Sequence, residues 1–146
     1  MTTLIAPDPV VDLTSQLNDQ RRKVDFDTYD ITVQQLIAMV ETDVINVAPA
    51  YQRQYRWDEL RQSRFIESIF LGIPIPSLFM AANPDGTWEL VDGVQRLSTL
   101  VHFAGNEKAR LKLGMRTRLE LSNLEKLPDF KGTFEALPPK GQRTSA

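Results

Sequence analysis

The chain has 146 residues, a net charge of −2 and 42% hydrophobic residues, which is enough for one modest core and predicts a single main domain. It contains no cysteine and one histidine, so disulfides and thiolate metal sites are excluded and a histidine-based zinc centre is disfavoured. No window approaches the roughly 18 apolar residues of a membrane span, and the first residues do not form a signal peptide. We therefore expect a cytoplasmic protein without membrane partners.

The N-terminal part of the sequence predicts an arm followed by a helix. Residues 1–27 mix prolines, acidic residues and a basic run with little periodicity, so we expect a mobile arm. Thr32 and Gln35 have the spacing of a capping box at a helix start. Apolar residues at positions 33, 36, 37 and 40 then form one face of a helix that ends near Glu41.

A strand is predicted over residues 45–48, and it leads into an aromatic-rich segment at 51–57. Asp58 can cap the next helix, which Gly72 ends. The predicted buried face of this helix consists of Phe65, Ile66, Ile69 and Phe70. The apolar runs 77–81 and 87–91 flank the turn sequence Asn-Pro-Asp-Gly and predict a β-hairpin.

The string D-G-V-Q-R-L-S-T-L at residues 92–100 follows the second strand of this hairpin and opens a helix that ends at Gly105. The predicted buried residues of that helix are Leu97, Leu100, Val101 and Ala104. The first N–H groups of a helix have no intrahelical partner, and its dipole adds about half a positive charge there. With Arg96 in the first turn, this corner predicts an anion-binding site that suits phosphate.

The chain contains three ordered motifs: P-A-Y-Q-R-Q-Y-R-W at 49–57, a helix ending I-F-L-G-I-P-I-P at 69–76, and the string at 92–100. Together they resemble the N-terminal domain of GmrSD-type modification-dependent restriction endonucleases, over about residues 26–137. The resemblance implies an α+β fold related to ParB and sulfiredoxin, a small mixed sheet with packed helices. The implied domain spans residues 28–137, and residues 138–146 form a loop-like tail of a chain that is short for the family.

In several bacterial phage-defence proteins of this kind, an Asp-Gly-Gln-Gln-Arg motif marks a site that binds and hydrolyses nucleotides. The resemblance implies catalytic roles for Asp92, Gln95 and Arg96 and nucleotide contacts from these residues together with Gly93, Gln52 and Arg53. Val94 stands where the family usually has its first glutamine, so hydrolysis stays open.

Each of these residues also has a structural alternative. Arg96 binds a phosphate or pairs with a nearby acid, and Asp92 holds Mg²⁺ or caps the helix. Gly93 allows positive φ or close approach of a ligand, and either role excludes a side chain. Arg53 contacts the nucleotide or stacks on one of the neighbouring aromatic rings. For His102 we expect an exposed surface histidine rather than a catalytic base.

The function implied by the resemblance is a regulatory or sensor domain of a DNA restriction or phage-defence system that binds a nucleoside triphosphate, with Mg²⁺. Whether the domain is an enzyme stays open. His102 is the only histidine, so the His-Asn-His nuclease domain found in such systems is absent from this chain, and a nuclease partner on another chain is expected.

The alternative is a non-enzymatic adaptor that binds DNA or a protein partner through its basic C-terminal third. From residue 106 onward nine basic residues stand against five acidic ones, which predicts weak, salt-dependent DNA binding at most. A ParB-like nuclease is less favoured, because no cluster of acidic metal ligands is apparent. The candidate DNA-binding residues are Lys108, Arg110, Lys112, Arg116 and Arg118.

Overall fold

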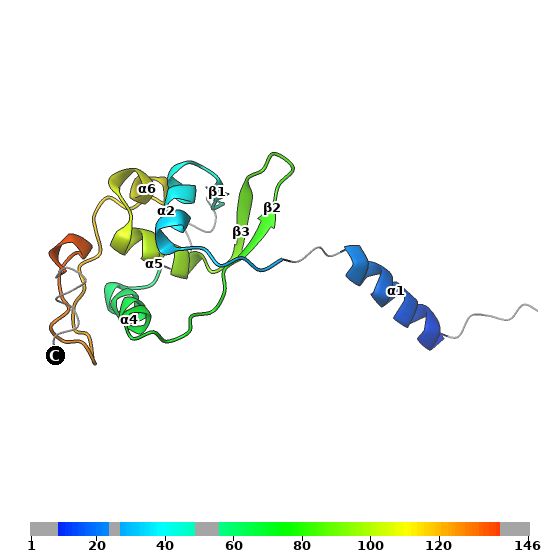
Figure 1. Cartoon of the computed structure of the whole chain (residues 1–146), viewed down its shortest axis with the longest axis horizontal. Helices are drawn as coiled ribbons and strands as arrows, with labels where there is room; N and C mark the ends of the chain where they lie inside the picture. The colour runs from blue at the N-terminus through cyan, green and yellow to red at the C-terminus, as the bar shows by residue number, and fades with distance from the viewer. Residues whose placement is uncertain (1–8, 24–26, 49–55, 138–146) are drawn as a thin grey trace, which may run out of the picture. The chain divides into compact units, whose positions relative to one another are not determined.

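The computed structural model describes residues 9–23, 27–48 and 56–137, and the chain divides into two compact units, Met1–Asp30 and Ile31–Ala146 (Figure 1). The first unit contains helix α1 (Pro9–Lys23), on which the side chains of Leu13 and Leu17 are exposed. The sequence pattern does not predict this helix, because its apolar residues are few and weakly periodic. The mobility of the arm stays a prediction.

Within its described residues, the second unit combines four α-helices with three short strands, which confirms the predicted α+β class (Figure 1). In chain order these elements are α2 (Val33–Glu41), β1 (Ile45–Asn46), α4 (Glu59–Phe70), β2 (Phe79–Ala82), β3 (Trp88–Asp92), α5 (Val94–Ala104) and α6 (Glu107–Lys112), and a 3-10 turn η1 (Phe134–Ala136) follows. None of the described helices is long and apolar enough to cross a membrane.

Side-chain caps fix the starts of α2 and α4, as the sequence predicts. The Thr32 hydroxyl accepts a hydrogen bond from the backbone N–H of Gln35 at 3.0 Å, and the Asp58 carboxylate accepts one from the N–H of Arg61 at 2.8 Å. Such caps satisfy N–H groups that lack an intrahelical partner. Beyond α4, Gly72 adopts a left-handed φ of 73° that ends the helix.

The three strands form one mixed sheet in the order β1-β3-β2. The predicted hairpin is confirmed: β2 runs antiparallel to β3 with Met80 opposite Leu90, and the N–H of Asn83 donates to the carbonyl of Thr87 across the turn. β1 covers only Ile45–Asn46 of the predicted strand and runs parallel to β3. The carboxyl ends of β1 and β3 therefore lie at the same edge of the sheet.

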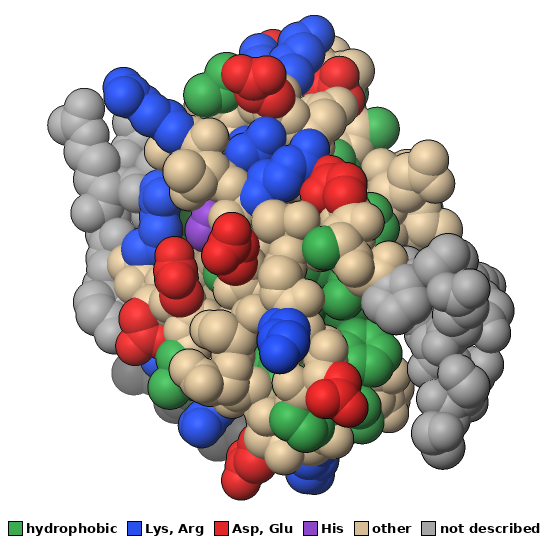
Figure 2. Space-filling view, turned by 90° about the vertical axis from the view of Figure 1, so that its left-hand side faces the viewer, with side chains coloured by type: hydrophobic (Ala, Val, Ile, Leu, Met, Phe, Trp, Pro, Cys, Tyr) green, Lys and Arg blue, Asp and Glu red, His purple; other side chains and the backbone are tan. Residues whose placement is uncertain are grey.

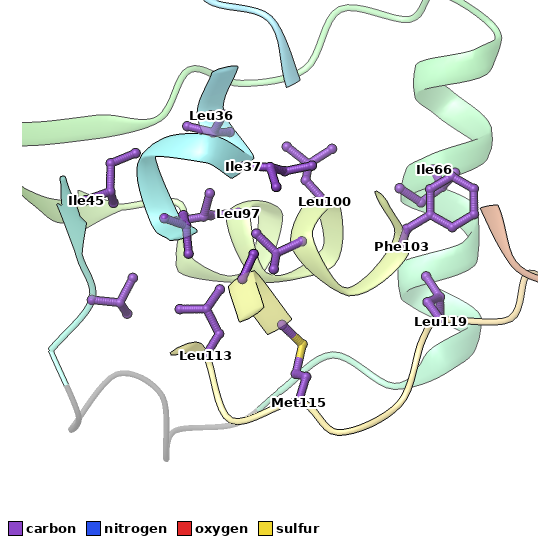
Figure 3. Close-up of a cluster of buried hydrophobic side chains, with 14 of the residues drawn as sticks. Leu36, Ile37, Ile45, Ile66, Leu97, Leu100, Phe103, Leu113, Met115 and Leu119 are labelled. Atoms are coloured by element: carbon purple, nitrogen blue, oxygen red, sulfur yellow. The ribbon is translucent and has the colours of Figure 1, made fainter. Parts of the chain in front are cut away.

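Helix α5 forms the centre of the hydrophobic core. Leu97 and Val101 have no solvent exposure, and the helix contacts α2, α4 and α6. Figure 3 shows side chains from α2, β1, α4 and the segment after α6 converging on this helix. Thr99 and Phe103 are also buried, whereas Ala104 is half-buried, so the buried face is wider than predicted.

The buried face of α4 differs from the prediction. Ile66 is buried as predicted, but Phe65, Ile69 and Phe70 are only half-buried. The other buried residues of the helix are polar: Gln62, Ser63 and Glu67. Buried polar side chains need hydrogen-bond partners, and these find backbone groups. The Glu67 carboxylate accepts from the N–H groups of Lys126 and Leu127, each at 3.0 Å. A pattern of apolar residues cannot reveal such a polar face.

The segment after α5 contains a short helix, α6, that no pattern in the sequence predicts. Asn106 caps α6 by accepting the N–H of Ala109 at 2.8 Å, and Gly114, beyond the helix, has a left-handed φ of 75°. Leu121 and Gly132 then pair as an isolated antiparallel bridge. Contacts between aromatic rings join this region to the core through Phe70, Phe103, Phe130 and Phe134.

We predict that Glu67→Ala lowers the free energy of unfolding by about 2–4 kcal/mol, because it leaves two backbone N–H groups without their charged acceptor. Urea unfolding followed by circular dichroism measures the change. Glu125→Ala is the matched control, since Glu125 is exposed in the same C-terminal segment. An unchanged midpoint in Glu67→Ala would show that the carboxylate does not anchor this segment.

Candidate functional site

The candidate site begins at the corner between β3 and α5. Gly93 is the N-cap of α5 and has a φ of 102°, a left-handed conformation that favours glycine. A Cβ at this position would collide with the side chain of Leu78 and would lie close to the Arg96 guanidinium. The predicted need for glycine is therefore confirmed. The strand-turn-helix order at this corner is confirmed as well.

Asp92 is the last residue of β3, and its side chain is 68% exposed. No side chain caps α5, so the capping alternative for Asp92 is wrong: the turn places Gly93 rather than Asp92 at the N-cap. The Asp92 carboxylate instead lies 3.6 Å from Nη2 of Arg96, one helical turn further on. Asp92 thus points its charge toward the arginine of its own corner.

Arg96 is mostly buried, with 17% of its side chain exposed. Its Nη2 donates to the backbone carbonyl of Ser77 at 3.0 Å, which ties the start of α5 to the segment before β2. Its Nε is buried and has no hydrogen-bond partner within the described parts of the chain. The structural alternative for Arg96, pairing with a nearby acid, is therefore present in its ion pair with Asp92. The Nε–H of the guanidinium can still donate a hydrogen bond.

Gln95 connects the corner to the end of the aromatic-rich segment. Its Oε1 accepts the backbone N–H of Trp57 at 2.9 Å, and Gln62 Nε2 donates to the carbonyl of Trp57 at 2.9 Å. The Trp57 ring packs edge-on against Phe65, with the guanidinium of Arg61 4.6 Å from its centre. The structure thereby brings the third motif together with the end of the first.

The other residues of the first motif that were assigned to the nucleotide lie outside the described residues. Gln52 and Arg53 belong to positions 49–55, so their roles, and the proposed stacking of Arg53, stay predictions. Arg56 is described, and its Nη2 donates to the carbonyl of Leu113 at 3.2 Å. Val94, the first residue of α5, is half-buried and packs against the core cluster.

His102 is half-buried rather than exposed, so the expectation of a surface histidine is wrong (Figure 2). Its Nδ1 lies 2.7 Å from Oε1 of Gln62, a residue 40 positions away that no local pattern could connect to it. Because Gln62 Nε2 already donates to Trp57, its Oε1 accepts, and we assign the imidazole proton to Nδ1.

The surroundings of His102 lower its pKa. Burial is the main cause, and the guanidinium groups of Arg56 and Arg110 act in the same direction. The Glu59 carboxylate and the Thr117 carbonyl oppose them and raise the pKa. The net direction is downward, so the imidazole is neutral near pH 7.

The described residues contain no group of three or more potential metal ligands among histidine, aspartate and glutamate. Asp92 stands alone as an exposed carboxylate at the corner. Mg²⁺ usually keeps several waters and binds one or two carboxylates together with substrate phosphates. A single carboxylate at the candidate site is compatible with that mode of binding.

The five basic residues proposed for DNA are divided between internal contacts and the surface. Arg110 is 7% exposed and donates to the carbonyl of Arg116, Lys112 pairs with Asp43 at 2.6 Å, and Arg118 pairs with Glu135. Lys108 and Arg116 are exposed. Three of the five residues thus have partners within the chain, two of them acidic, and DNA binding stays a prediction.

A pocket of about 180 Å³ is lined by residues of α2, β1 and the end of α6, and its lining includes the Lys112–Asp43 ion pair. Its lining contains none of the residues Asp92 to Arg96. The remaining lining residues are Val40, Ile45, Asn46, Val47 and Leu113.

We predict that the protein becomes less stable as the pH falls from about 7.5 to about 5.5. The unfolded chain binds the His102 proton at the ordinary pKa of about 6.5, whereas the folded chain binds it only at lower pH, so acid favours unfolding. His102 is the only histidine, which makes this range specific to it. Urea midpoints for the parent and for His102→Asn, which keeps a donor toward Gln62, measure the effect. Equal losses in both proteins would assign the pH dependence to other groups.

Comparison with known proteins identifies the family. The family model of the GmrSD restriction endonuclease N-terminal domain matches residues 33–142, which include α2 to α6, the first motif and the β3–α5 corner. No curated protein and no solved structure matches the chain. Since the family match spans well over half of the 146 residues, this chain belongs to the family of GmrSD restriction endonuclease N-terminal domains.

Proposed function

We propose that this chain binds a nucleoside triphosphate at the β3–α5 corner and serves as a regulatory or sensor domain in a bacterial DNA restriction and phage-defence system. Family membership supports the role in restriction. The observation that carries nucleotide binding is the geometry of the corner: a glycine with positive φ, followed by a helix start and a mostly buried arginine.

The sheet supports this position for a ligand. In sheets with parallel strands, ligands bind outside the carboxyl ends of the strands, and β1 and β3 end at the same edge. At that edge α5 begins, and its first intrahelical hydrogen bond joins the N–H of Leu97 to the carbonyl of Gly93. The N–H groups of Val94 and Arg96, which precede this bond, thus have no acceptor within the helix and suit phosphate oxygens.

The charges of the corner suit a metal-bound phosphate chain. Asp92 would hold Mg²⁺ through its exposed carboxylate, and Arg96 would donate to phosphate oxygens in place of Asp92. The metal would neutralise part of the phosphate charge. The chain's own contribution to hydrolysis is positioning and charge stabilisation by Arg96 and the start of α5, without a covalent intermediate.

The relation to the ParB and sulfiredoxin fold belongs to the same proposal, and the mixed sheet with its packed helices supports it. Val94 favours a second candidate, a non-enzymatic adaptor, because an isopropyl group packed on the core cannot orient water. In that case the exposed members of the basic set available to DNA are Lys108, Arg116 and Lys112, the last of which is paired with Asp43. Phosphate release at saturating nucleotide distinguishes the enzyme from the adaptor.

We predict that Arg96→Ala weakens nucleotide binding about tenfold to a hundredfold, or roughly 1.5–3 kcal/mol, because one charge-assisted contact is lost. A thermal-shift panel of ATP, GTP, CTP and UTP, with and without Mg²⁺, first selects the ligand. Calorimetry then compares the variant with Arg64→Ala, which removes an exposed arginine of α4. If none of the four nucleotides shifts the melting temperature of the parent, the proposed function is wrong. A dissociation constant unchanged by Arg96→Ala removes this residue from the site.

We also predict that Val94→Gln raises nucleotide turnover more than it raises affinity, because an amide at the start of α5 can orient water and an isopropyl group cannot. The change also replaces an apolar side chain packed on the core, so melting temperatures are measured beside the rates. Phosphate release is followed at saturating nucleotide for both proteins. Equal and appreciable rates would show that position 94 is dispensable for the chemistry.

A further inference from the structure

Two side chains form hydrogen bonds to the backbone of Trp57, and a third side chain orients one of them. Gln95 Oε1 accepts its N–H at 2.9 Å, and Gln62 Nε2 donates to its carbonyl at 2.9 Å. His102 Nδ1, at 2.7 Å from Gln62 Oε1, fixes the orientation of that amide. We call this set, Gln95, Gln62 and His102, the Trp57 clamp.

The clamp joins elements that are distant in the sequence. Gln62 belongs to α4 and is 3% exposed, while Gln95 and His102 lie two turns apart on the same side of α5. Arg56, beside Trp57, is tied to the carbonyl of Leu113 just beyond α6. Residues 56 and 57 are therefore attached to α4, α5 and the end of α6 at once.

The geometry points to a positioning role for Gln95 rather than the catalytic role that the family resemblance implies. We propose that Gln95, with Gln62 and His102, fixes residues 56–57 against the start of α5 and so acts on a bound nucleotide through this backbone. The effect on a nucleotide rests on the proposed function. The hydrogen bonds of the Trp57 clamp are present whether or not the chain binds a nucleotide.

The hydrogen-bond balance supports this assignment. If Gln95 Oε1 turned to a ligand or a water, the N–H of Trp57 would lose its acceptor in a partly buried place. Leaving such a donor unpaired costs about 1–3 kcal/mol, as much as the new contact would return. Gln95 therefore does more for the site by keeping its bond to Trp57 than by exchanging it.

The test uses a Trp88→Phe parent, in which Trp57 is the only remaining tryptophan of two. Gln95→Met and Gln62→Met remove the two amides at nearly constant length, alone and together. Gln34→Met, an exposed glutamine of α2, is the matched control. Trp57 emission is recorded without nucleotide, and affinity for ATP, GTP, CTP and UTP with Mg²⁺ is measured by calorimetry. Circular dichroism verifies that each variant is folded.

Each single variant is expected to red-shift the Trp57 emission and to weaken nucleotide binding about tenfold. The double variant should bind nucleotide no more weakly than either single variant, because both amides act through the same backbone unit. Gln95→Glu, which keeps an acceptor oxygen, should restore the parental emission. The control variant should match the parent in both measurements.

Two results would overturn the positioning role. One is a loss of affinity in Gln95→Met with unchanged Trp57 emission, and the other is a double variant whose loss is the product of the single losses. Either result means that Gln95 touches the nucleotide directly. If the parent binds none of the four nucleotides, the proposed function fails, and the emission of Gln95→Met and Gln95→Glu still decides whether the clamp exists. If Gln62→Met does not fold, the emission of Gln95→Met and Gln95→Glu also decides whether the Trp57 clamp exists.

Discussion

The burial of one face of α5 is the constraint on which the rest of the second unit depends. Leu97 and Val101 are completely inaccessible to solvent, and full burial of such side chains contributes roughly 1.5–3 kcal/mol each. Because α2, α4 and α6 all contact this helix, its axis is fixed from several sides. Its first turn is also the candidate site, so the residues that would meet a ligand lie at the end of an element that is packed against three other helices.

Around this apolar centre, buried polar side chains determine how the remaining segments attach. α4 presents Gln62 to the backbone before it and Glu67 to the backbone of the C-terminal segment. Each of these hydrogen bonds contributes only modestly to the free energy of folding, but leaving a buried donor or acceptor without a partner would destabilise the fold much more. The arrangement therefore favours one specific placement of the segments, which a purely apolar face could not select so strictly.

The features that the sequence predicts are those with local signals. Thr32 and Asp58 cap their helices, and the turn at Asn83 and the corner at Gly93 form where the residue types require them. Sequence reasoning misses α6, which is a single short helix, and the polar face of α4, where the partners of Glu67 lie about 60 residues away. The burial of His102 depends on Gln62 in the same way, since only the tertiary structure brings the two together. At the candidate site the turn could be predicted, but not the side-chain contact between Gln95 and Trp57.

The ion pair between Asp92 and Arg96 bears on which anions the corner would accept. An arginine that already has its own counter-ion contributes little net field, so a bare anion arriving at the corner meets the Asp92 carboxylate as well as the guanidinium. A polyphosphate that carries a divalent cation supplies a partner for each of the two charges. We therefore expect the corner to discriminate against free phosphate and against the backbone of nucleic acids. The basis of this discrimination would be charge balance rather than shape.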